Sequence, residues 1–468
     1  MSPIILSVTI IAYFVILFTI SYIAGHKADN EGFFVGNRKS AWYIVAFAMI
    51  GSTISGVTFV SVPGMVQASS FSYLQMVLGF IVGQFIIAFV LVPLFYRMKL
   101  VSIYEYLENR FGTSSYKTGA WFFFISKMLG AAVRLFLVCL TLQLLIFEPF
   151  GIPFLANVIL TVFIVWLYTF RGGVKSLIWT DVLKTFCLVV SVVLCIYYIS
   201  SSLHLNFGGL ISTISDSDLS KMFFFDDVND KRYFFKQFLA GVFTVIAMNG
   251  LDQDMMQKTL PCRNLREAKK NMYCYGFSFI PLNFLFLCLG ILLLALAGQM
   301  QLELPAMNDD ILPMFATQGY LGHSVLILFT IGIIAAAFSN SDSALTAMTT
   351  SVCIDLLNTE KDTEEVARRK RKRVHLLLSV LLAFFICLVE MLNNKSVIDA
   401  IYIIASYTYG PLLGMFAFGL FTRLFRGRLP LRFFHPPADK RPAGPAHRHR
   451  LSGALLRSGL VDQQRNRI

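Results

Sequence analysis

The stretch 335–357, AAAFSNSDSALTAMTTSVCIDLL, combines the apolar character of a membrane-spanning helix with a row of polar residues. Its side-chain oxygens recur at helical spacing, at Ser339, Asp342, Ser343 and Thr346, so they would share one face of a helix. Several oxygen donors on one face suit a small hard cation such as Na⁺. The hydroxyls alone could equally bond to their own helix and hold helices together. The carboxylate of Asp342 favours a functional site, because a buried charge needs a partner that serines do not supply.

A second polar stretch lies at membrane depth within the apolar run 41–67. Residues 51–56 read GSTISG, and Pro63 follows. Two glycines among hydroxyl residues predict a helix that is broken in the middle of the membrane, whose freed carbonyl groups can coordinate a cation. A kinked but continuous helix is the alternative.

Charged residues within other apolar runs are further candidates. Lys127 and Arg134 lie in one such run, and a guanidinium there would bind a carboxylate, either of a substrate or of the protein itself. Asp181 lies about one turn into the run 177–200. It either stabilises the N-terminal end of its helix or reaches inward to a cation. The polar run 249–257 either forms a gate or is the frayed end of a span.

The composition requires a membrane to accommodate these segments. The chain has 468 residues, of which 56% are hydrophobic and 14% charged, and many runs reach the roughly 20 apolar residues that cross a bilayer. We predict eleven spans, at 4–24, 41–67, 74–96, 119–147, 152–170, 177–200, 234–252, 273–298, 321–357, 374–392 and 397–422.

Basic residues are concentrated in alternate loops between these spans, which accounts for much of the net charge of +13. The loops 68–73, 148–151 and 299–320 have no lysine or arginine, and the loop 201–233 is acidic. The positive-inside rule then predicts a multi-pass protein of the cell membrane, with its N-terminus outside and its C-terminus cytoplasmic. Basic loops of this kind indicate topology, so no nucleic-acid partner is expected.

Catalysis has little support in the sequence. It contains no P-loop, no GxSxG, no HExxH and no CxxC, and its eight cysteines are scattered. We therefore expect no enzyme activity and no transition-metal centre, and no obligate protein partner is evident. A membrane enzyme would need a catalytic constellation that the chain does not offer.

Taken together, several stretches resemble the sodium:solute symporter family. They run in the family's order from about 30 to 422, and they read EGFFVGNRKSAWYIVAFAMIGSTISGVTF, YEYLENRFG, RGGVKSLIWTDVLK, DQDMMQKTL, AAAFSNSDSALTAMTTSVCIDLL and YGPLLGMFAFGLF. The resemblance implies an all-α polytopic membrane protein with a LeuT-type inverted repeat of five plus five helices and one extra N-terminal helix. The implied parts are the extra helix and loop 1–29, the first repeat 30–200, the external loop 201–233, the second repeat 234–422 and a basic tail 423–468.

The resemblance also implies where Na⁺ binds. A first site would use the backbone carbonyls of Gly51, Ile54 and Ala336 with side-chain oxygens of Ser339 and Asn340. Asn340 stands where the family usually has Ser or Thr.

Some family members, including the sodium/sialic acid symporters, have a second sodium site. It corresponds here to Asp181, Ser339, Asp342 and Ser343. Asp342 replaces a hydroxyl in that pattern. Two carboxylates would bind a cation more strongly, or one of them would be protonated and couple a proton.

For the solute, a partial resemblance to the sodium/sialic acid symporters points to five residues: Thr53, Ser55, Thr58, Gln75 and Arg134. The implied function is a Na⁺-coupled importer of a small organic solute by alternating access, with a sugar acid such as sialic acid, or a sugar, as the best candidate. The alternative is a transporter-like nutrient sensor or receptor without net flux. The tail departs from the family from about residue 426, where a shifted reading frame or a truncation explains the Arg-, Pro- and His-rich sequence better than a regulatory role does.

Overall fold

The structure is a computed structural model that describes residues 3–26, 28–54, 56–305, 307–392 and 395–422. The described helices belong to one compact unit, residues 1–427. Two subjects of the sequence analysis, Ser55 and the basic tail from 423 onward, lie outside the described residues.

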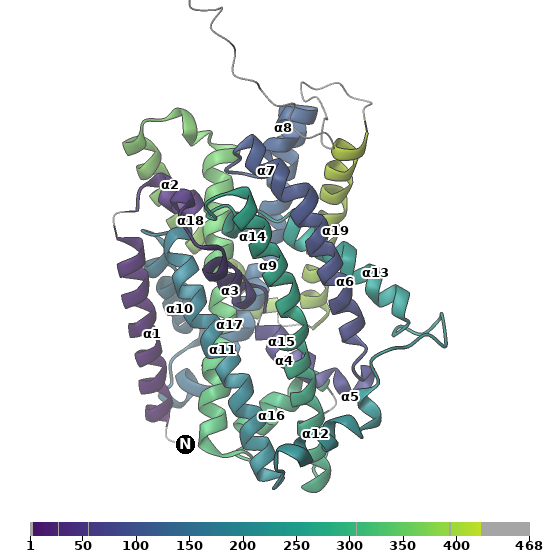
Figure 1. Cartoon of the computed structure of the whole chain (residues 1–468). Coiled ribbons are helices and arrows are strands. Elements are labelled where there is room, and N and C mark those ends of the chain that lie inside the picture. Colours follow the sequence, from purple (N-terminus) through teal and green to yellow (C-terminus); the bar gives the residue numbers. More distant parts are fainter. Residues whose placement is uncertain (1–2, 27, 55, 306, 393–394, 423–468) are drawn as a thin grey trace, which may run out of the picture. The chain divides into compact units, whose positions relative to one another are not determined.

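Each of the eleven expected spans coincides with a helix or a helix pair (Figure 1). The long helices are α1 (Pro3–Gly25), α6 (Tyr73–Ile86) continuing into α7 (Val92–Met98), α9 (Thr113–Leu142), α10 (Phe154–Thr169), α11 (Val174–Ser202), α15 (Leu265–Gln299), α17 (Gly322–Ser351), α18 (Glu364–Leu392) and α19 (Lys395–Phe421). The bent pairs are α3 (Trp42–Thr53) with α4 (Gly56–Gly64), and α13 (Phe234–Val245) with α14 (Gln253–Thr259). Within the described residues, 7 helices are long and apolar enough to cross a membrane, or up to 9 if each bent pair is one span.

In each of the two bent pairs, the helix axis changes direction sharply at a break in the span. The axis turns by 68° between α3 and α4 and by 73° between α13 and α14. Ile54, directly after α3, has the extended angles φ −79° and ψ 109°, so the backbone leaves the helix at the predicted GSTISG stretch. The break expected there is confirmed. The second break is a finding of the structure, because the polar run 249–257 by itself indicates only a gate or a frayed helix end.

Helix α17 lies at the centre of the packing and is buried continuously from Gly332 to Ser351. It packs against α11, α9, α18, α4 and α3, while α11 also packs against α3 and α1. Glycine allows the closest of these approaches, because a Cβ atom at Gly51 of α3 would lie 2.1 Å from Thr185 Oγ1 of α11. The polar face of α17 is therefore enclosed by protein and shielded from lipid.

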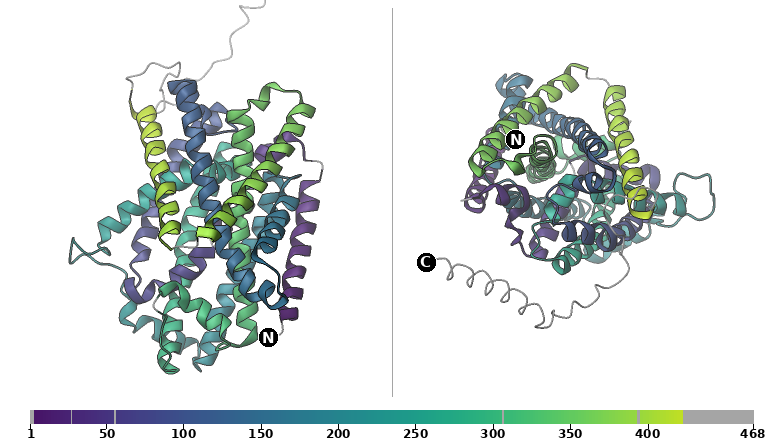
Figure 2. Two further views of the ribbon diagram at one scale, coloured as in Figure 1. Left: turned by 180° about the vertical axis from the view of Figure 1, so that it is seen from behind. Right: turned by 90° about the horizontal axis from the view of Figure 1, so that it is seen from above.

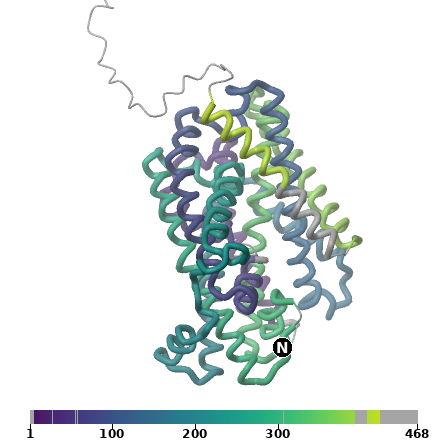
Figure 3. Tube along the Cα trace, turned by 90° about the vertical axis from the view of Figure 1, so that its right-hand side faces the viewer, coloured from purple at the N-terminus to yellow at the C-terminus, as the bar shows by residue number. Residues whose placement is uncertain are grey.

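Short connecting helices separate to the two ends of the bundle. They are α2 (Asn30–Val35), α5 (Val66–Ser69), α8 (Glu105–Phe111), α12 (Phe207–Ser215) and α16 (Ile311–Thr317). In Figure 1, α2 and α8 lie at the upper end, whereas α5, α12 and α16 lie at the lower end, where α1 begins. The expected basic and non-basic loops thus lie at opposite ends. Helix α19 lies beside α9 on the face seen in Figures 2 and 3.

Candidate cation and solute sites

The break after α3 faces the polar part of α17. The side-chain amide Nδ2 of Asn340 lies 3.1 Å from the carbonyl oxygen of Ala336 and 3.5 Å from that of Ile54. The carbonyl groups at the end of a helix lack intrahelical partners, so the oxygen of Ile54 is available to a donor or a cation. Rotation of the Asn340 side-chain amide by 180° would place its Oδ1 oxygen, instead of Nδ2, beside these two carbonyl groups. These three residues form what we call the carbonyl position.

The contacts of the other two predicted ligands of the first site involve α11. Gly51 packs its Cα against Thr185 of α11, a contact that does not involve its carbonyl group. The hydroxyl of Ser339 donates a hydrogen bond of 2.8 Å to Oδ1 of Asp181 and lies 3.5 Å from Ser52 Oγ. The structure thus brings Ile54, Ala336 and Asn340 to one point, and turns Ser339 toward a neighbouring group of charged residues.

That neighbouring group contains two carboxylates and two ammonium groups, all buried, and we call it the carboxylate–lysine cluster: Asp181 and Lys184 of α11, Asp342 of α17 and Lys258 of α14. Lys184 Nζ lies 3.1 Å from Asp181 Oδ1 and also contacts Asp342 Oδ2. Lys258 Nζ lies 2.9 Å from Asp181 Oδ2. Each ammonium therefore has a carboxylate partner, and Lys184 joins both carboxylates.

Hydroxyl groups complete the surroundings of the two carboxylates. Ser52 Oγ donates to Asp181 Oδ2 over 3.0 Å, and the Tyr168 hydroxyl donates to Asp342 Oδ2 over 2.8 Å. Ser343 Oγ makes a longer hydrogen bond, 3.3 Å, to Asp342 Oδ1. The cluster is thus both charge-balanced and hydrogen-bonded, which are the conditions under which buried ions are tolerated.

The residues predicted for a second sodium site do come together, but a lysine lies among them. Two carboxylates and two ammonium groups sum to zero, so a further cation here would be an uncompensated buried charge, which costs several kcal/mol. Sequence reasoning missed Lys184 and Lys258. Lys184 was detectable, because it follows Asp181 by three residues within an apolar span and so lies on the same helix face. Lys258 was not, because only the break before α14 carries it inward.

A cavity of about 300 Å³ adjoins the carbonyl position. Three of the predicted solute-binding residues line it, namely Thr53, Thr58 and Arg134, and so do Ile54 and Asn340. The rest of the lining comes from α3, α6, α9, α13, α14, α15 and α19 and from the break between α13 and α14: Ser52, Tyr73, Met76, Phe80, Lys127, Thr244, Val245, Met248, Asn249, Asp252, Met255, Phe279, Asn283 and Tyr409. A solute in this cavity would therefore lie next to a cation at the carbonyl position.

The two basic residues of α9 differ in their partners. Lys127 Nζ forms buried ion pairs with Asp252 at 3.0 Å and Asp254 at 2.7 Å, and Tyr409 donates to the same Asp252 at 2.8 Å. Lys127 thus forms a structural salt bridge between α9 and the beginning of α14. Arg134 lines the cavity, and in the part of the chain that the structure describes no carboxylate or hydrogen-bond acceptor is paired with it.

Gln75 does not line this cavity, contrary to the sequence expectation. Its Nε2 donates to the carbonyl of Arg232 over 2.8 Å, and its Oε1 accepts from the backbone N–H of Phe224 over 3.1 Å. The side chain is fully buried, and both ends of its amide are used to hold the loop 201–233 against α6. This amide is therefore committed to the loop, which leaves no group for a solute.

The architecture agrees with that of known proteins. A sequence model described as the sodium:solute symporter family matches residues 33–426. The chain belongs to this family. As a sodium:solute symporter it is a multi-pass membrane protein that couples solute transport to Na⁺, and its relatives are transporters, which points away from an enzyme.

Three relatives of this symporter have low sequence identity to it but match most of its length. The sodium/sialic acid symporter NanT of Aliivibrio fischeri is 26% identical over 85% of this chain and 78% of that protein. SiaT of Proteus mirabilis, also a sodium/sialic acid symporter, is 23% identical over 86% of this chain and 81% of its own length. The human sodium/iodide cotransporter is 24% identical over 85% of this chain and 62% of its own length.

A solved structure of a Na⁺-coupled sialic acid symporter, in a substrate-bound outward-open state, has the same fold. It superimposes with a TM-score of 0.77 at 22% identity, over 89% of this chain and 87% of that one. The LeuT-like fold implied by the sequence is therefore confirmed.

Proposed function

We propose that this symporter imports a small acidic solute, with a sugar acid such as sialic acid as the best candidate, together with one Na⁺ by alternating access. The solute would occupy the 300 Å³ cavity, whose volume is at the lower end of small-molecule sites. The Na⁺ would bind at the carbonyl position beside it.

The proposal of an acidic solute rests on the position of Arg134. The guanidinium of Arg134 lines the cavity and forms no ion pair with a carboxylate of the described residues, since Asp252 in the same lining is paired with Lys127. Such a guanidinium matches a planar anion in geometry and charge. Thr53 and Thr58 line the same cavity and are hydroxyl residues of the kind that fix the orientation of a polyol. NanT and SiaT carry sialic acid in their names, which supports the same class of solute.

The proposal that only one Na⁺ is transported rests on the carboxylate–lysine cluster. Lys184 lies between Asp181 and Asp342, where it supplies the positive charge that a second cation would bring. Coupling of one Na⁺ to one anionic solute is then the proposed stoichiometry.

We also propose that the two bent pairs mark equivalent places in two inverted repeats, 30–200 and 234–422. Each pair is the first span of its proposed repeat, and each bends by a similar angle, 68° and 73°. With α1 as an extra helix, the positive-inside rule supports an N-terminus outside and a cytoplasmic C-terminus.

Uptake by proteoliposomes tests the function. A Na⁺ gradient should drive accumulation of a sugar acid, with a Hill coefficient for Na⁺ near one, and an equal K⁺ gradient should not. Uptake indifferent to Na⁺, or saturable binding without flux as in a sensor, would contradict the proposal.

Arg134→Gln tests the class of solute. We expect its KM for the acidic solute to rise about 10- to 100-fold, because a hydrogen bond to a charged group contributes about 1.5–3 kcal/mol. Arg97→Gln, which removes the same charge from an exposed residue at the end of α7, is the matched control. Equal effects in the two variants would remove Arg134 from the site.

A further inference from the structure

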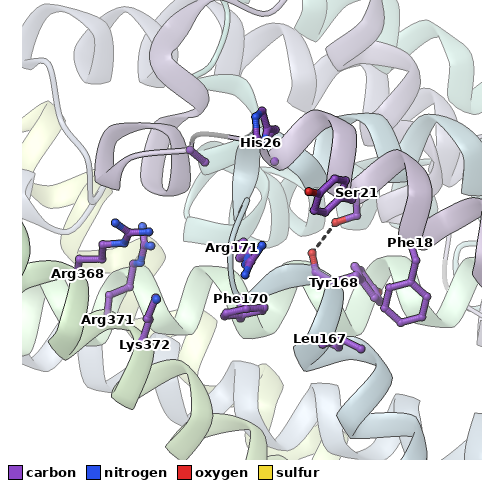
Figure 4. A pocket seen from close by; sticks show the side chains of 13 residues that line it. Phe18, Ser21, His26, Leu167, Tyr168, Phe170, Arg171, Arg368, Arg371 and Lys372 are labelled. Atoms are coloured by element: carbon purple, nitrogen blue, oxygen red, sulfur yellow. Dashed lines mark hydrogen bonds between the residues drawn. The ribbon is translucent and has the colours of Figure 1, made fainter.

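A second cavity, of about 610 Å³, lies away from the transport site, between α1, the end of α10 and the beginning of α18. Figure 4 shows Arg368, Arg371 and Lys372 extending from α18 on one side, with Arg171 facing them from the turn before α11. Phe18 of α1 lies at the other side. The transport mechanism uses none of these residues.

Within the described part of the chain, the cations around this cavity form no ion pair with an acidic side chain. Arg368, Arg371 and Lys372 have the i, i+3, i+4 spacing of one helix face, and among the described residues that line the cavity none is acidic. Two basic residues between them behave differently. Arg369 pairs with Glu365 at 2.5 Å and Lys370 with Asp362 at 2.8 Å. In the basic run of α18, two residues therefore have an acidic partner and three line the cavity, while the exposed Arg373 does not line it.

Arg371 provides an independent observation. It is only 2% exposed, yet its Nε has no hydrogen-bond partner within the described part of the chain. Its Nη1 reaches the carbonyl of Asp29 only at 3.4 Å, and its guanidinium lies 4.2 Å from the centre of the Phe33 ring. A buried guanidinium without an anion is costly, and an anionic group in the cavity would compensate it.

The opposite side of the cavity is apolar and reaches the surface of the bundle. Phe18, Tyr22 and Leu167 line it, and Tyr22 is 65% exposed and Leu167 39% exposed. Both lie on apolar helices, α1 and α10, whose exposed faces would meet lipid. A free anion would use only the basic side, whereas an amphipathic anion would use both.

We propose that this cavity binds an anionic phospholipid. Its phosphate would lie among Arg171, Arg368, Arg371 and Lys372, and its chain would leave along Phe18 and Leu167. Basic pockets between membrane helices on the cytoplasmic side are suited to such headgroups. The proposed orientation of the chain places this end of α18 on the cytoplasmic side.

Thermal unfolding of the delipidated full chain in neutral detergent tests the proposal. Phosphatidylglycerol should raise the midpoint by about 5 °C at saturation, since a ligand that binds only the folded state stabilises it. Phosphatidylcholine should raise it much less, and so should inorganic phosphate. Native mass spectrometry should show retained phosphatidylglycerol under the same conditions.

Variants locate the effect. Arg368→Gln with Lys372→Gln should abolish the phosphatidylglycerol shift, and Arg171→Gln, on a different segment, should reduce it. The matched control, Arg369→Gln with Arg373→Gln, removes the same charge from exposed positions of α18 that do not line the cavity, and it should keep the shift.

Three outcomes would overturn the proposal. Equal shifts with phosphatidylglycerol and phosphatidylcholine would remove the anion requirement. An equal shift with inorganic phosphate would identify a free-anion site. Equal loss in the cavity and control variants would mean that the lipid is attracted by the general charge of α18.

Discussion

Two groups of oxygen atoms lie beside each other at the centre of this symporter. They differ in whether the protein itself supplies positive charges that neutralise them. At the carbonyl position, Ile54 and Ala336 offer neutral oxygens, and the side chain that donates to them is the uncharged amide of Asn340. In the carboxylate–lysine cluster, Asp181 and Asp342 are already neutralised by protein ammonium groups. Neutral oxygens can bind and release Na⁺ at a moderate cost in free energy. In a cluster whose charges already balance, a further cation would be uncompensated.

The comparison teaches that oxygen donors on one helix face do not by themselves define an ion site. The net charge of the whole neighbourhood decides whether a cation is still needed, and that sum includes residues from other helices. Here α17 contributes to both places, but α11 and α14 neutralise only one of them.

The largest expected effect breaks the balanced cluster. Lys184→Met leaves two buried carboxylates with Lys258 as their single cation, and breaking such an ion pair destabilises a fold by about 3–5 kcal/mol. We expect a lower midpoint of thermal unfolding in K⁺ and a larger rescue by Na⁺ than in the wild type, because the external ion can then replace the ammonium.

A double variant serves as the control for Lys184→Met. The double variant Lys184→Met with Asp342→Asn lacks one charge of each sign. Its midpoint of thermal unfolding should return most of the way to that of the wild type, and the extra stabilisation by Na⁺ should disappear. A Lys184→Met protein as stable as the wild type, with an unchanged response to Na⁺, would refute the role given to this lysine.

The next effect concerns the carbonyl position. Asn340→Ala removes the side chain that joins Ile54 and Ala336, and we expect the half-saturating Na⁺ concentration for uptake to rise about 10- to 100-fold, equivalent to about 1.5–3 kcal/mol. Ser341→Ala is the matched control, because the Ser341 hydroxyl bonds back to Ala337 of its own helix at 3.0 Å. If both variants keep the wild-type Na⁺ dependence, Na⁺ binds elsewhere.

The smallest effect sharpens the comparison. Ser343→Ala removes only a 3.3 Å hydrogen bond to Asp342, so the free energy of unfolding should fall by about 0.5–1 kcal/mol. The half-saturating Na⁺ concentration should stay within roughly twofold of the wild type. A shift as large as that of Asn340→Ala would show that a second Na⁺ uses Ser343 despite the lysines.

The comparison between prediction and structure is most favourable where the information is local. The break at 51–56 follows from glycines and hydroxyl residues in one short stretch, and the axis does turn there by 68°. Likewise the polar face of α17 follows from helical spacing alone. Gln75 shows the limit, because its type and its span suited a solute, but its partners, Arg232 and Phe224, come from a loop about 150 residues away.

The sequence by itself determined the apolar spans, the first break and the residues that carry charge into the membrane, because hydropathy and helical periodicity depend on near neighbours in the chain. Only the tertiary structure decided which charges meet. Lys258 reaches Asp181 across 77 positions of sequence because α14 begins at a second break, and Lys184 lies against Asp342 because α11 and α17 pack together. Such pairings depend on how helices are rotated and bent against each other, and helical spacing along one segment carries no information about that.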